Sequence, residues 1–114
     1  MNTYTLKFNE FRIFEVNVKK LDDLKLENPI SFIKIDVEGH EIEVIQGAIK
    51  VIKKNKPILL VEIEERYSKK KVIDTINYIN SLGYKSFYCD EEKLINTGAL
   101  ANLDEYNNYI FKPN

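Results

Sequence analysis

The chain has 114 residues, the size of one small domain, and we expect a single domain over residues 1–114. Its 17 basic and 18 acidic side chains leave a net charge of −1, which excludes a global field that attracts nucleic acid or an anionic membrane. The single Cys89 excludes an internal disulfide, and no N-terminal apolar segment resembles a signal peptide or a membrane span. We therefore expect a cytoplasmic protein without a nucleic-acid or membrane partner.

The first predicted elements are two short strands in residues 1–18. Apolar side chains alternate with other residues at Tyr4, Leu6, Phe8, Phe14, Val16 and Val18. Such alternation is typical of half-buried strands, so this segment predicts two strands or a hairpin. The following segment KKLDDLKLENP, residues 19–29, has enough leucines for one helical turn or a short helix before Pro29.

Strands and helices alternate from residue 30 to residue 89. An apolar run at 30–37 predicts a strand, and helical spacing from Ile42 to Ile52 predicts one helix of roughly four turns. The run 58–63 is almost uninterrupted in its apolar character, which predicts a strand covered on both faces. A second helix is predicted from about residue 68, with Gly83 as its C-terminal cap.

The last predicted elements are the strands YKSFYCD (84–90) and NNYIFKP (107–113), separated by a polar stretch that contains Gly98. We expect them to form an antiparallel pair near the end of the sheet. The alternation of buried strands with helices before them indicates an α/β fold with a helix-flanked parallel sheet. In such sheets, ligands bind beyond the carboxyl ends of the strands.

The segment DVEGHE, residues 36–41, lies at such a carboxyl end. Asp36 follows a buried strand, so its carboxylate is aimed at the crevice and is a candidate functional group. Gly39 permits a sharp turn, whereas Glu41 suits the start of a helix through the helix dipole. In the structural interpretation, the neighbouring Glu38 and His40 are only solvated surface.

A metal site is a further interpretation of the same segment. Oxygen ligands would come from Asp36 and Glu38, with His40 in the same loop and Glu62 or Glu64 from the next strand. No fixed spacing distinguishes this pattern from an ordinary acidic loop, and a carboxylate pair for acid–base catalysis is an equally open interpretation.

The chain resembles the C-terminal half of the FkbM family of S-adenosylmethionine-dependent methyltransferases. The segment that carries this resemblance is KLDDL…ISFIKIDVEGHEIEVIQGAIKVIKKNKPILLVEIEE. The matching motifs are LDD at 21–23, K-I-D-V-E-G-x-E at 34–41, E-x-x-V-x-x-G-A at 41–48, P-x-x-x-x-E at 57–62, GY at 83–84, and N-x-x-F before a proline at 108–113. The resemblance covers residues 16–113.

This resemblance implies half of a doubly wound Rossmann-like methyltransferase sheet, a mixed sheet with flanking helices. It implies S-adenosylmethionine as the cofactor and O-methyl transfer to a sugar or natural-product hydroxyl, that is, to a small-molecule or glycan acceptor. Asp36 and Glu38 would be catalytic, Asp36 and Glu62 would contact the cofactor, and no metal ligand is implied. The family's glycine-rich turn lies upstream of these residues, so we expect a fragment or shortened gene product that binds the cofactor weakly or not at all by itself.

A competing hypothesis is a non-enzymatic interaction module or inactive remnant that binds no cofactor. A third is the small metal-binding domain built on the acidic loop. The run 32–37 would have a neighbour on each side in the family sheet, and one of them is missing here. An apolar strand with a free edge tends to pair with another strand. We therefore expect two chains to associate across that edge as a homodimer, in preference to the alternative in which Tyr4–Val18 of the same chain covers it.

Overall fold

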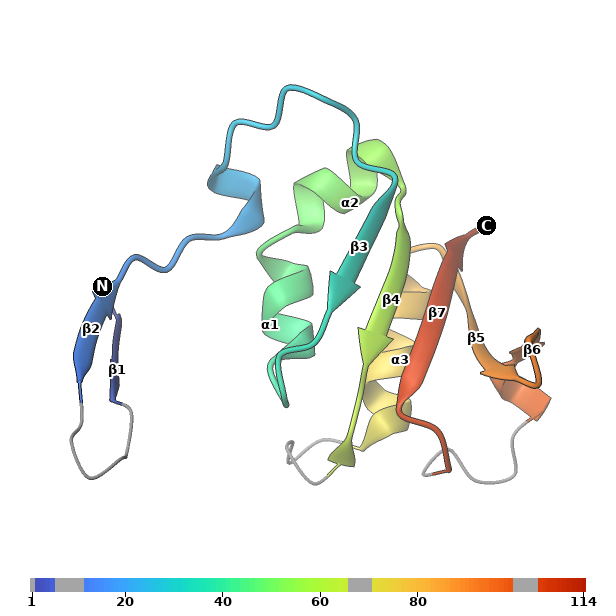
Figure 1. Cartoon of the computed structure of the whole chain (residues 1–114). Coiled ribbons are helices and arrows are strands. Elements are labelled where there is room, and N and C mark those ends of the chain that lie inside the picture. Colours follow the sequence, from blue (N-terminus) through green and yellow to red (C-terminus); the bar gives the residue numbers. More distant parts are fainter. Residues whose placement is uncertain (1, 6–11, 66–70, 100–104) are drawn as a thin grey trace.

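The computed structural model describes residues 2–5, 12–65, 71–99 and 105–114, whose strands form two sheets (Figure 1). The small sheet is an antiparallel pair of β1 (Asn2–Thr5) and β2 (Ile13–Val16). The large sheet has the strand order β3-β4-β7-β5-β6. Its strands are β3 (Phe32–Ile35), β4 (Ile58–Glu62), β5 (Tyr84–Asp90), β6 (Lys93–Asn96) and β7 (Asn108–Pro113). Strands β3 and β4 run parallel, and the other neighbouring pairs are antiparallel.

The helical elements of the described residues include the 3-10 turns η1 (Leu21–Asp23) and η3 (Thr97–Ala99) and the helices α1 (Glu41–Gln46), α2 (Ile49–Asn55) and α3 (Val72–Ser81). The three α-helices lie on one face of the large sheet, and the core fills the space between them and that face (Figure 1). In β4, Leu59 and Val61 are fully buried, whereas Ile58 on the other face is exposed. The prediction of a strand covered on both faces is therefore wrong. Among the described helices, none is long and apolar enough to cross a membrane.

The single helix predicted after β3 is in fact two helices, which are separated at Gly47. The cause is Asp22 of η1, whose carboxylate accepts hydrogen bonds of 3.0 Å from the N–H groups of Lys50 and Val51. The Asp22 N–H in turn donates to the Gly47 carbonyl over 2.9 Å. Because the first N–H groups of a helix have no partner within it, this carboxylate is the N-terminal cap of α2.

Two predictions about the later elements are confirmed. Helix α3 ends at Ser81, and Gly83 adopts a φ of 93°, the left-handed conformation of a helix cap. Strands β5 and β7 pair antiparallel. The polar stretch between them does not predict a strand, yet it contains β6, an exposed strand at the sheet edge.

The N-terminal hairpin is confirmed by the antiparallel pairing of β1 with β2. Its predicted half-burial is wrong for β2, all of whose residues are exposed. The predicted strand positions Leu6 and Phe8 lie outside the described residues. The small sheet shares no strand with the large one, so it leaves the edge of β3 uncovered.

Candidate active site

The carboxyl ends of the parallel strands β3 and β4 bring acidic side chains together around one small hollow. The lining residues are Asp36, Glu38, Glu41, Glu62 and Glu64. Neighbouring parallel strands end at the same edge of a sheet, which is where open α/β sheets bind their ligands. The structure thus places the predicted residues Asp36, Glu38 and Glu62 beside one another. Glu64, which the sequence suggests only as a metal ligand, follows two residues after the end of β4 and also lines the hollow.

The turn after β3 gives two of these acids different environments. Glu38 and Gly39 have φ angles of 47° and 101°, so the chain reverses sharply before α1. Glu41 is 3% exposed, and its Oε1 accepts a 3.0 Å hydrogen bond from the Gly39 N–H. Glu41 therefore holds the turn closed, whereas Glu38 is exposed. His40 precedes α1, is exposed, and makes no side-chain cap to the helix.

The surroundings of Glu62 in this hollow shift the pKa of its carboxyl. Burial raises the pKa of its carboxyl above the ordinary value of 4.5, and the charges of Asp36 and Glu64, with hydrogen bonds to both, raise this pKa further. Neighbouring carboxylates repel one another, which disfavours their simultaneous ionisation. Glu62 consequently holds a proton to a higher pH than a solvated glutamate does.

We expect Glu62→Gln to raise the melting temperature at about pH 7, with the gain disappearing at about pH 4. Because the pKa of Glu62 is raised in the folded state, ionisation of Glu62 destabilises the fold. This destabilisation is absent below pH 4.5, grows as the pH rises towards the raised pKa, and is complete above it. Thermal unfolding followed by circular dichroism at both pH values measures this difference. The exposed Glu91 provides the control, because Glu91→Gln should leave both melting temperatures unchanged. A lower melting temperature for Glu62→Gln at neutral pH would contradict the prediction.

The hollow is small. Its volume is about 10 Å³, roughly the space of one water molecule. Cofactor sites usually need about 300–1,000 Å³, so these side chains can form one wall of such a site but not the whole enclosure. Within the described ranges, no group of three His, Cys, Asp or Glu side chains is arranged to hold a metal ion, so the geometry gives the metal hypothesis no support.

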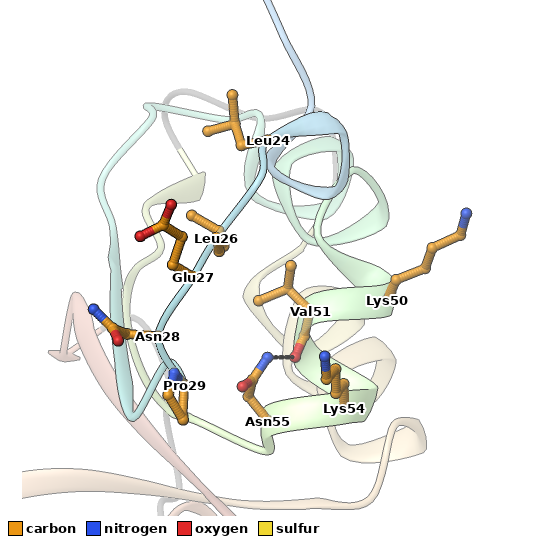
Figure 2. A pocket seen from close by; sticks show the side chains of 9 residues that line it. All are labelled: Leu24, Leu26, Glu27, Asn28, Pro29, Lys50, Val51, Lys54 and Asn55. Atoms are coloured by element: carbon orange, nitrogen blue, oxygen red, sulfur yellow. Dashed lines mark hydrogen bonds between the residues drawn. The ribbon is translucent and has the colours of Figure 1, made fainter.

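A larger hollow of about 270 Å³ lies between α2 and the connector that precedes β3, and was not predicted (Figure 2). Its lining residues are Leu24, Leu26, Glu27, Asn28, Pro29, Lys50, Val51, Lys54 and Asn55. Asn55 joins the two walls, since its Nδ2 donates to the Val51 carbonyl over 2.9 Å and its Oδ1 accepts from the Ile30 N–H over 3.2 Å. The hollow lies at the amino end of β3, the opposite end from the acidic hollow, where α/β sheets do not usually bind ligands.

The fold resembles the crystal structure of methyltransferase FkbM from Methylobacillus flagellatus KT, with a TM-score of 0.55 and 22% sequence identity. The alignment covers 97% of this chain but 25% of that chain, so this chain spans a quarter of its length. At such an identity the likeness concerns the fold, and it confirms the predicted α/β class with a mixed sheet and flanking helices. No curated protein matches this chain.

Residues 2–86 match the sequence family described as the methyltransferase FkbM domain. The matched range begins and ends earlier than the predicted resemblance over 16–113, so β7 lies outside it. It includes both β3 and β4, and with them every residue of the acidic hollow. Because the match takes in well over half of the chain, the protein belongs to the FkbM methyltransferase domain family.

Proposed function

We propose that the acidic hollow is one wall of an S-adenosylmethionine-dependent O-methyltransferase site. The observation that supports this proposal is the convergence of Asp36, Glu62 and Glu64 at the carboxyl ends of two parallel strands. Three neighbouring carboxyl groups favour a cation, and the sulfonium group of S-adenosylmethionine is a cation. The charge of the hollow therefore fits this cofactor, while its volume requires further walls.

The acids of the hollow would have different roles in methyl transfer. Asp36 is exposed at the end of β3, where its carboxylate can orient the acceptor hydroxyl and accept the proton that this hydroxyl loses. Glu62 would face the cofactor, because a carboxyl with a raised pKa can donate a hydrogen bond or, once ionised, offset positive charge. Glu38 would contact the acceptor from the turn. We propose a sugar or natural-product hydroxyl as the acceptor.

We expect S-adenosylmethionine to bind this chain only at about millimolar concentration, because one wall cannot enclose it. Nuclear magnetic resonance of the isotope-labelled chain detects such weak binding. Amide signals at 36–39 and at Glu62 should shift during the titration. S-Adenosylhomocysteine, which lacks the positive charge, should shift them less.

The Asp36→Asn variant should respond less than the wild type to S-adenosylmethionine, whereas the exposed control Glu91→Gln should respond fully. Equal responses to the charged and uncharged ligands would contradict the role of the carboxylates. Signals that move only around the larger hollow would contradict the proposed site and favour an interaction module.

A further inference from the structure

Strand β3 has an open edge whose free backbone groups can be identified. The Ser31 carbonyl accepts a 2.9 Å hydrogen bond from the Ile58 N–H, and the register with β4 pairs Phe32 with Ile58 and Lys34 with Leu60. Successive residues of a strand direct their backbone groups to opposite sides. The N–H and C=O groups of Phe32 and Lys34 therefore point away from β4. No strand among the described residues pairs with this side.

Within the described part of the chain, strand β2 also has a free edge, because it pairs with β1 on one side and belongs to a sheet of two strands. Its apolar side chains are solvated: Ile13 is 60% exposed and Phe14 is 49% exposed. On the edge of the large sheet, Phe32 is likewise 54% exposed. A two-stranded hairpin without a packing partner is marginally stable, so the small sheet gains stability from any surface that covers it.

The two free strands complement each other in a parallel register that aligns IFEV (13–16) with FIKI (32–35). Every apolar side chain then lies beside an apolar one, and Glu15 lies beside Lys34. A shift by one residue places Glu15 beside an isoleucine and moves each side chain to the wrong face. An antiparallel arrangement that keeps Glu15 opposite Lys34 would bring Ile13 against Asp36. Charge and pattern thus select the parallel register.

We propose that two copies of this chain exchange their N-terminal hairpins, so that β2 of each copy pairs in parallel with β3 of the other. In its own chain β2 lies apart from the large sheet (Figure 1). Only residues 17–20 separate β2 from η1, and Asp22 fixes η1 to α2. A reciprocal exchange fills both open edges and buries both hairpins, which is a low-cost route to a closed dimer.

The first test reverses one charge of the pair in the full chain. Glu15→Lys and Lys34→Glu each create two like-charge contacts per dimer, so either variant should weaken dimerisation by about tenfold or more. Light scattering over a dilution series measures this change. Both residues are exposed, so the fold should persist, which circular dichroism verifies. Lys85→Glu, an exposed site on β5, should dimerise like the wild type.

The second test mixes the Glu15→Lys and Lys34→Glu variants, neither of which should dimerise well alone. In a hairpin-exchanged heterodimer, the substituted position 15 of one copy faces the substituted position 34 of the other, so their opposite charges attract. The second contact of this heterodimer is the native pair of Glu15 with Lys34, which is also attractive. The mixture should therefore recover the wild-type dimer affinity.

Two results would overturn the exchange of hairpins. One is a wild-type chain that remains monomeric throughout the dilution series, and the other is a mixture of the two variants that stays monomeric. The chain that carries both substitutions provides a further check, because its two contacts per dimer are again attractive and it should dimerise like the wild type. If the double variant recovers the wild-type melting temperature but the mixture of the two single variants does not dimerise, then β2 pairs with β3 of its own chain.

Discussion

Leu59→Ala should lower the free energy of unfolding by about 2–5 kcal/mol, the usual cost of removing a fully buried leucine. Leu59 is 0% exposed and lies between Ile33 of β3 and Phe111 of β7 in the sheet. Its removal leaves a cavity against the helices that the neighbouring strands cannot fill without moving. Urea denaturation at one fixed protein concentration measures the loss.

The matched control for this substitution is its neighbour on the same strand. Ile58 is 37% exposed on the other face, so Ile58→Ala removes a side chain of the same size without opening a core cavity. We expect a loss of less than about 1 kcal/mol, as is usual for a partly exposed position. Equal losses for the two variants would show that both faces of β4 are packed, contrary to the structure.

Asp22→Ala should cost about 1–2 kcal/mol, because the N–H groups of Lys50 and Val51 lose their acceptor. Hydrogen exchange at these two amides should accelerate more than exchange in α3, since the loss is local to the start of α2. Asp23→Ala is the control, because Asp23 is exposed and its side chain has no role in this cap. Similar losses at both positions would mean that net charge, and not the cap, sets the stability.

The sequence predicted those helices and strands that are determined by residues close to one another along the chain. Alternation and helical spacing located β3, β4, α3 and the β5–β7 pair, because neighbouring side chains determine these patterns. The break at Gly47 was missed because its cause, Asp22, acts through tertiary contact from a distant segment. Strand β6 was missed because it is only four residues long and largely exposed, with two apolar residues between two polar ones, so its pattern does not differ from that of a loop.

The proximity of Asp36 and Glu62 followed from topology, since parallel strands place both residues at the same edge of the sheet. The raised pKa of Glu62 could not be predicted, because it depends on burial and on how closely the carboxyl groups of Asp36 and Glu64 approach. Sequence motifs also gave no measure of the enclosed volume. The catalytic roles of Asp36 and Glu38, and the cofactor contact of Glu62, stay predictions.

The order of the large sheet has a consequence for how the protein is made. Strand β7 is the last strand of the chain, yet it lies between β4 and β5 (Figure 1). While the ribosome is synthesising the chain, β3–β4 and β5–β6 emerge before the strand that joins them. Tyr109 and Phe111, both 0% exposed, complete the core only after residue 113 has left the exit tunnel. Until that moment the nascent chain has two open inner edges, which are natural targets for chaperones and proteases.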